Sequence, residues 1–126
     1  MYPVRSSLEA GAVLVAGSDA PVASRDPRPF VNMAMAVTRR LPGEPMLSKA
    51  QTVPIREVLD AYTINGARML GRDSEFGSIA VGKSADFVVL DRDIVRLGDE
   101  GRAEEIRATR VLETWFAGRR VYRRHR

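Results

Sequence analysis

The hydrophobic pattern of the chain opens on one uninterrupted apolar run. Residues 12–16 read Ala-Val-Leu-Val-Ala and are followed at once by glycine, serine, aspartate, alanine and proline. A short apolar run bounded by turn residues predicts a strand that is buried on both faces. Gly17–Pro21 is then the loop at the carboxyl end of that strand. In parallel α/β folds, ligands and catalytic side chains gather at this end of the sheet.

Asp19 is the one acid in that loop, and it is the first candidate functional residue. The pattern leaves two interpretations open. Asp19 is a site carboxylate held at the end of an apolar strand, or it only caps a turn or a helix, because serine, aspartate and proline are ordinary turn residues.

Helical spacing of apolar residues predicts two helical segments close to this strand. Residues 5–10 read as the end of a helix, and Gly11 is well placed to terminate it. Phe30–Arg40 carries apolar residues at intervals of three or four, which predicts an amphipathic helix. Asp26 followed by Pro27 predicts the N-cap of that helix and its first position.

A further amphipathic pattern covers residues 55–70. Thr52 is the candidate cap of this helix, with Pro54 in its first turn. Asn65-Gly66 is the point at which the pattern predicts a kink or a division into two helices. Gly71 is expected to end it.

The pattern changes after residue 72, where glycines separate short β-prone runs. Gly77–Lys83 predicts a short strand and a turn, and Ala85–Asp91 predicts a strand apolar enough to be central. Residues 92–105 are charged and predict a surface loop. Val111–Ala117 and Arg120–Arg123 predict a hairpin around Gly118-Arg119. The chain therefore divides into an αβαα segment, 1–72, and an all-β segment, 73–126.

Composition places the chain in the globular class. Its 126 residues are 44% hydrophobic and 29% charged, which fits one folded domain. We expect no membrane span, because no apolar run approaches ~18 residues. The first residues lack the layout of a signal peptide, and cysteine is absent, so we expect a cytoplasmic location.

Histidine is the count that limits the chemistry most. The single histidine is His125, next to the last residue. A zinc site needs three or four rigidly held ligands, and a Ser-His-Asp triad needs an internal histidine base. The sequence excludes both as self-contained sites. A carboxylate site that uses Asp19 with another acid stays open.

The net charge of +4 comes mostly from the end of the chain, where five of the last eight residues are arginines. This arginine segment is short, and Tyr122 is the one aromatic residue within it. Phosphate-driven nucleic-acid binding needs a broader basic surface, so we expect no nucleic-acid partner.

Several motifs recur along the chain in a fixed order. Taken together, they resemble the C-terminal part of the amidohydrolase superfamily, in the amidohydrolase-3 branch that includes the N-substituted formamide deformylases. The segments that carry this resemblance are 8–11 (LEAG), 17–22 (GSDAPV), 36–40 (AVTRR), 61–67 (AYTINGA), 77–91 (GSIAVGKSADFVVLD) and 114–122 (TWFAGRRVY).

The resemblance implies an α/β fold. Residues 1–72 would form the last βα portion of a TIM-like (β/α)8 barrel, with its final strand at 13–16. Residues 73–126 would form the C-terminal strands of a small composite β-sandwich domain. Lys83 and Asp86 would shape the turn that leads into those strands.

The resemblance also gives Asp19 a role. In such enzymes the aspartate after the last barrel strand takes a proton from a metal-bound water and often contacts the metal, so Asp19 is implied both as general base and acid and as a metal ligand. Ser18 would support the loop. Arg25 and Arg28 would be solvated loop charges or would reach the mouth of the site.

The family's histidine ligands and its bridging lysine or glutamate are absent from these residues. We therefore expect zinc or another divalent metal only in a complete enzyme, which would act on a small amide-type molecule. The 126 residues alone are expected to be inactive, as a fragment or as one piece of a split enzyme. Exposed apolar surface would be covered by self-association or by an upstream partner chain. The alternative is a non-catalytic assembly domain derived from the same fold.

Overall fold

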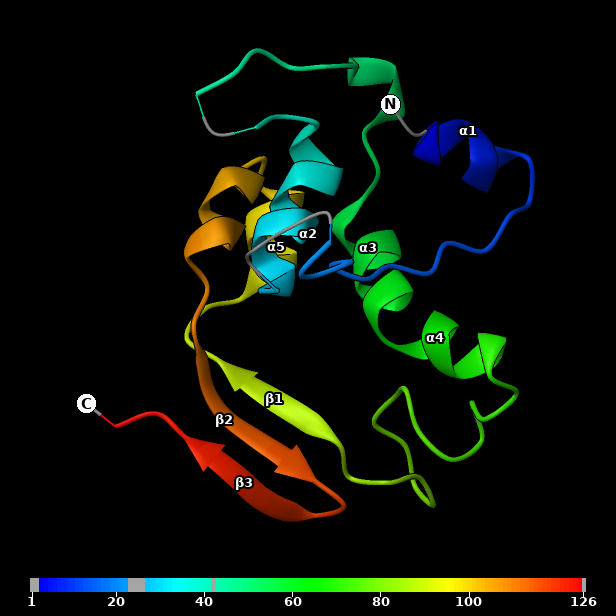
Figure 1. Ribbon diagram of the computed structural model, residues 1–126, viewed down its shortest axis with the longest axis vertical. Helices are drawn as coiled ribbons and strands as arrows, with labels where there is room; N and C mark the ends of the chain where they lie inside the picture. The colour runs from blue at the N-terminus through cyan, green and yellow to red at the C-terminus, as the bar shows by residue number, and fades with distance from the viewer. Residues whose placement is uncertain (1–2, 23–26, 42, 126) are drawn as a thin grey trace.

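The structure is a computed structural model, and it describes residues 3–22, 27–41 and 43–125. Helices and strands are mixed along this part of the chain (Figure 1). Their order and bounds are α1 Val4–Glu9, α2 Pro29–Thr38, η1 Lys49–Gln51, α3 Ile55–Tyr62, α4 Ile64–Met69, β1 Phe87–Leu90, α5 Ile94–Asp99, η2 Ala103–Ala108, β2 Val111–Phe116 and β3 Arg119–Arg123.

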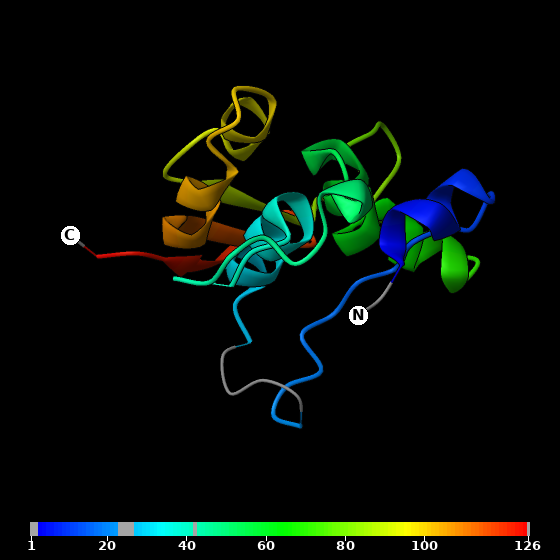
Figure 2. The same ribbon diagram turned by 90° about the horizontal axis from the view of Figure 1, so that it is seen from above.

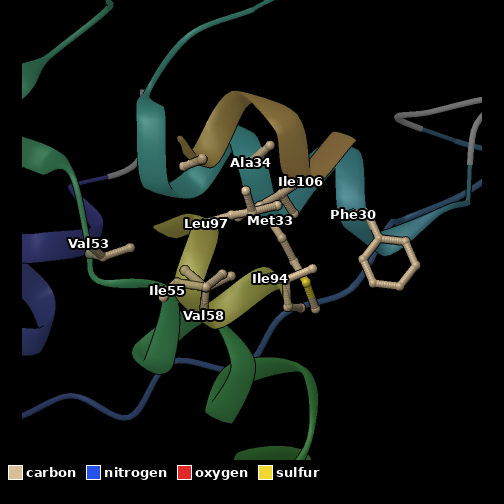
Figure 3. Close-up of a cluster of buried hydrophobic side chains, with 10 residues drawn as sticks. Phe30, Met33, Ala34, Val53, Ile55, Val58, Ile94, Leu97 and Ile106 are labelled. Atoms are coloured by element: carbon tan, nitrogen blue, oxygen red, sulfur yellow. The ribbon is translucent and has the colours of Figure 1, made fainter. Parts of the chain in front are cut away.

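One hydrophobic core joins four of the helical elements. Helix α2 packs against η2 and α3, and α5 packs against η2 and α3. Ala34 on α2 and Ile106 on η2 are completely inaccessible to solvent, and Ile55 at the start of α3 is 1% exposed. Figure 3 shows these side chains converging from three separate stretches of sequence. The core draws on residues from both sides of position 72, and the division of the chain there stays a prediction.

Helix α2 confirms the apolar spacing but differs from the expected bounds. Its buried residues are Phe30, Met33 and Ala34. It begins with Pro29 in the first turn, where proline's fixed φ suits a helix. It ends at Thr38, because Arg39 takes up a left-handed conformation with φ of 53°. The expected cap at Asp26 lies outside the described residues.

The predicted helix over 55–70 is two helices, as its Asn-Gly pair indicated, but the break falls earlier. Thr63 separates α3 from α4 with φ of −131° and ψ of −97°, which no α-helical residue adopts. Thr52 does not cap α3: its hydroxyl donates to the carbonyl of Lys49 at 3.0 Å, and Pro54 occupies the N-cap position.

The sheet has three antiparallel strands in the order β1–β2–β3. The predicted hairpin is confirmed, although its turn is Ala117-Gly118, one residue earlier than expected. Both turn residues have positive φ, 49° and 74°, as tight hairpin turns of the right twist require. Phe87 lies opposite Trp115, and their rings stack with centroids 5.5 Å apart.

Three expectations for residues 73–126 were wrong. Gly77–Lys83 forms turns and no strand, and β1 lies at the edge of the sheet, not at its centre. The expected loop at 92–105 holds α5 and the first half of η2, so this half is not all-β. Its charged residues lie on the outer side of short helical turns, whereas Ile94, Leu97 and Ile106 fill the core. The helical elements α5 and η2 are each six residues long, which is too short for the helical spacing of their apolar residues to be recognised among the charged residues.

Two glycines with opposite surroundings test the packing of the core. A Cβ added at Gly98 in α5 would lie 2.6 Å from the Cβ of Ile55, whereas a Cβ added at Gly66 in α4 would meet nothing within 4 Å. We expect Gly98→Ala to lower the free energy of unfolding by about 1–3 kcal/mol through overpacking. Gly66→Ala should raise it by up to about 1 kcal/mol through helix propensity. Urea denaturation of both variants measures the difference, and equal values would contradict this packing.

Asp91 gives the fold a pH dependence. Its Oδ1 accepts from Arg92 Nε and from the Arg110 amide, both at 2.9 Å. The Arg92 hydrogen bond, followed by that from the Arg110 amide, lowers the pKa of Asp91 from its ordinary 3.8 to about 2. These contacts therefore stabilise the fold above pH 3.8, and the stabilisation is lost as the pH falls through about 2.

We expect Asp91→Asn to be less stable than the wild type at pH 6, with a difference that shrinks toward pH 2. Urea denaturation at a series of pH values measures this difference. A gap between the two proteins that is constant with pH would show that the ionised carboxylate is not the source of the stabilisation.

Candidate functional site

Residues 12–16 do not form the predicted strand. They are extended, but they pair with no strand in the described part of the chain. Val13 and Val15 are 66% and 37% exposed, whereas Leu14 and Ala16 are half-buried. The expectation of burial on both faces was therefore wrong. A doubly buried strand needs a neighbouring strand on each edge and a layer on each face, and the described residues place helices along one side only.

Helices α3 and α4 hold this extended segment in place. The amide of Ala16 donates to the carbonyl of Ala61 in α3 at 3.0 Å. The side-chain amide of Asn65 in α4 donates to the carbonyl of Leu14, also at 3.0 Å. Before the segment, Gly11 has φ of 88° and ends α1, as its position predicted. Figure 1 shows the segment running from α1 past α3.

Asp19 follows this segment with an exposed side chain and a left-handed backbone, φ 51°. Aspartate is one of the few residues that tolerate this conformation. The neighbouring Ser18 accepts a hydrogen bond from the Ala20 amide at 3.2 Å, which is the loop-supporting role expected of it. The turn interpretation of Asp19 thus has a direct structural basis, and its role as a site carboxylate stays a prediction. In Figure 2 the loop stands out from the body of the molecule.

The other charged residues that the sequence singled out are two arginines near the Asp19 loop and a lysine and an aspartate near β1. Arg25 lies outside the described residues, and Arg28 is exposed at the N-cap of α2. Lys83 donates to Ser78 Oγ at 2.8 Å, and Asp86 accepts from the Ala117 amide at 2.7 Å. Lys83 and Asp86 therefore shape the turn before β1 and join it to the hairpin, as predicted.

Hydrogen bonds from arginine or tryptophan side chains lower the pKa of four acids, Glu75, Asp91, Glu105 and Glu113. The indole of Trp115 donates to Glu113 at 2.9 Å, and this bond, followed by one from Arg120, lowers the pKa of Glu113. Burial raises the pKa of the Tyr62 phenol. Among residues 3–22, 27–41 and 43–125, no group of three or more histidine, cysteine, aspartate or glutamate side chains could hold a metal ion.

A groove of about 1340 Å³ opens between the helices and the sheet. It is mostly apolar, and Asp19 does not line it. Lys83 and Asp86 belong to its lining, and so do most of the chain's aromatic residues: Phe30, Tyr62, Phe76, Phe87 and Trp115. The sequence pattern did not predict this groove, because its lining comes from segments that are distant in sequence.

Asn65 is the residue that the sequence reasoning missed. It is 7% exposed, so an amide sits within the buried face of a short helix. The signal was available: a polar residue interrupts the apolar face of the 55–70 pattern. It was interpreted only as part of an Asn-Gly break, although a buried amide needs hydrogen-bond partners from elsewhere in the fold.

No helix in the described ranges is long and apolar enough to cross a membrane.

Comparison with known proteins gives a consistent result. An N-substituted formamide deformylase from Arthrobacter pascens is 39% identical over 124 residues, which are 98% of this chain and 22% of that enzyme. A 5-methylthioadenosine/S-adenosylhomocysteine deaminase from Thermoanaerobacter pseudethanolicus is 37% identical over 91 residues, 72% of this chain and 20% of that protein. The chain thus spans about a fifth of the length of these relatives.

The fold agrees with these matches. The crystal structure of an amidohydrolase from Thermotoga maritima superposes with a TM-score of 0.69 at 23% identity, covering 96% of this chain and 26% of that one. The sequence profile of the amidohydrolase family matches residues 1–122. The expected resemblance is therefore confirmed, and the chain belongs to the amidohydrolase family.

Proposed function

We propose that these 126 residues are the C-terminal part of a metal-dependent amidohydrolase that hydrolyses a non-peptide C–N bond in a small amide-type molecule. The observation that carries this proposal is the match to the formamide deformylase, which extends over 98% of the chain at 39% identity. N-substituted formamides, the substrates in that enzyme's name, are amide-type molecules of this kind.

The proposed architecture has a barrel part and a sandwich part. Residues 1–72 supply the last βα portion of a (β/α)8 barrel, and residues 73–126 supply strands of a small β-sandwich. The superposition on the Thermotoga maritima amidohydrolase supports a shared fold over this region. The extended, unpaired backbone at 12–16 supports a barrel strand whose neighbours lie outside these residues, because exposed strand edges are normally paired or covered.

In this proposal Asp19 moves the proton. The carboxylate accepts a proton from water as the water oxygen attacks the carbonyl carbon. It then returns this proton to the leaving nitrogen when the C–N bond breaks, so the products are an acid and an amine. The exposed position of Asp19, at the end of the segment held by α3 and α4, leaves it accessible to groups outside this chain.

The described residues do not fit a complete metal site. Asp19 can be one oxygen ligand, but no second and third ligand accompany it in the described ranges. Zinc or another divalent metal would take its remaining ligands from residues outside the chain. We infer that the 126 residues by themselves neither hold such a metal nor catalyse hydrolysis.

The partner in this proposal is an upstream chain or segment, with self-association in its absence. Val13 and Val15 expose apolar side chains on the open side of the extended segment, and the large groove exposes many more. Apolar surface of this extent is typical of a face that another chain covers. The same surface also favours the second candidate function, a non-catalytic assembly domain built on the amidohydrolase fold.

A chimera separates the two functions. The matched segment of the Arthrobacter pascens deformylase is replaced by these residues, and hydrolysis of an N-substituted formamide is measured. We expect an active chimera, and Asp19→Asn should lower kcat by about 10²–10⁴-fold, the range for a lost general base. Glu44→Gln, at an exposed loop position, is the control and should keep full activity.

An Asp19→Asn chimera that is folded and fully active would overturn the proposed role of Asp19. A folded chimera without any activity would favour the assembly function.

Self-association is tested at two valines of matched exposure. Val13 is 66% exposed on the apolar segment, and Val121 is 61% exposed on β3 among four arginines. We expect the chain to associate with rising concentration in sedimentation velocity experiments. Val13→Thr should weaken this association, whereas Val121→Thr should not, because like charges on an edge strand oppose pairing of two copies. A chain that stays monomeric at all concentrations, or equal effects of both variants, would contradict this surface.

A further inference from the structure

In the extended segment that leads to Asp19, exposed and half-buried residues alternate from Val13 to Ser18. Val13, Val15, Gly17 and Asp19 are exposed, and the residues between them, Leu14, Ala16 and Ser18, are half-buried. This is the period of two that an extended chain shows when one side lies on a support. The helices α3 and α4 are that support here, and Asp19 belongs to the open side.

The register of an extended segment decides which side each residue faces. A slip of one residue would turn Leu14 and Ala16 outward. It would also displace the turn at Asp19, whose left-handed backbone, φ 51°, ends the extended segment. Because the described residues include no strand partner for this segment, its register in the 126-residue chain depends on its contacts with the helices. The two long-range hydrogen bonds that the segment makes to the helices are Ala16 amide to Ala61 carbonyl and Leu14 carbonyl to the Asn65 side chain.

Asn65 is held in the orientation that this contact needs. Its Oδ1 accepts from Arg68 Nη1 at 3.0 Å, and its Nδ2 donates to the Leu14 carbonyl at 3.0 Å. The flipped amide would place NH₂ against a guanidinium and oxygen against a carbonyl, so both contacts would become repulsive. At 7% exposure the amide has no bulk water to replace a lost partner.

We propose that Asn65 is a positioning residue, whose hydrogen bond to the Leu14 carbonyl fixes the register of residues 12–19 and thereby keeps Asp19 on the open side of the segment. The catalytic consequence rests on the proposed function of Asp19. The register itself does not, because it is a property of the chain's own contacts.

Amide hydrogen exchange in the 126-residue chain tests the register. Asn65→Asp keeps the size of the side chain and its contact with Arg68 but cannot donate to the Leu14 carbonyl. We expect the Ala16 amide to exchange about tenfold faster, the factor of one lost hydrogen bond. The Val58 amide, which donates to the Pro54 carbonyl within α3, should be unchanged.

Thr63→Val is the matched control. The Thr63 hydroxyl donates to the Leu59 carbonyl in α3 at 2.7 Å. This hydrogen bond lies within the helices and does not involve the extended segment. Thr63→Val should therefore leave the exchange of the Ala16 amide unchanged. If Asn65→Asp does not fold, Arg68→Met is the second variant. Arg68 is exposed, and its removal takes away the guanidinium that orients the Asn65 amide, so exchange of the Ala16 amide should still accelerate.

An unchanged Ala16 amide in Asn65→Asp or in Arg68→Met would overturn the proposal. Equal acceleration at Ala16 and Val58 would also overturn it, because it would show a general loss of stability. In the deformylase chimera, Asn65→Asp should lower kcat and leave KM almost unchanged. If exchange responds as expected while Asp19→Asn stays active, the register role stands and the proposed function of Asp19 fails.

Discussion

Burial of α2 against η2 and α3 is the contact on which the rest of this structure depends. Ala34 and Ile106 are fully excluded from water at this interface, and Ile55 joins them from α3. The helices concerned are six to ten residues long, so none of them would be stable alone in water. Their stability comes from the shared apolar face, and that face also fixes where the sheet and the extended segment begin.

From this core the chain projects two surfaces that it does not cover itself. One is the open side of residues 12–19, where backbone groups lack the strand partners that an extended segment normally has. The other is the apolar groove between the helices and the sheet. Both are consistent with a chain that spans about a fifth of the length of its relatives.

The contact between Asn65 and Leu14 shows how the first of these surfaces is kept ordered. The buried amide of Asn65 donates to the Leu14 carbonyl and accepts from Arg68, so both of its polar groups have a partner. This contact links α4, which packs against the core helix α3, to a loop that we propose takes part in the reaction. The two groups are in direct contact, so no conformational change is needed to connect the helix with the loop.

The sequence by itself determined the elements whose signals are local. The Ala117-Gly118 hairpin, the buried face of α2 and the end of α1 at Gly11 follow from turn chemistry and from periodicity over a few residues. The family also followed from the sequence, because motifs in a fixed order along the chain do not depend on their spatial arrangement.

Tertiary structure alone decided whether an apolar run becomes a buried strand, and residues 12–16 show why. Their composition suits a strand with neighbours on both edges, but strand pairing is a property of the partners, and the described residues offer helices α3 and α4 instead. For the same reason only the fold could reveal the role of Asn65. Its partner lies 51 residues away in the sequence, and no local pattern records which carbonyl a buried amide will meet.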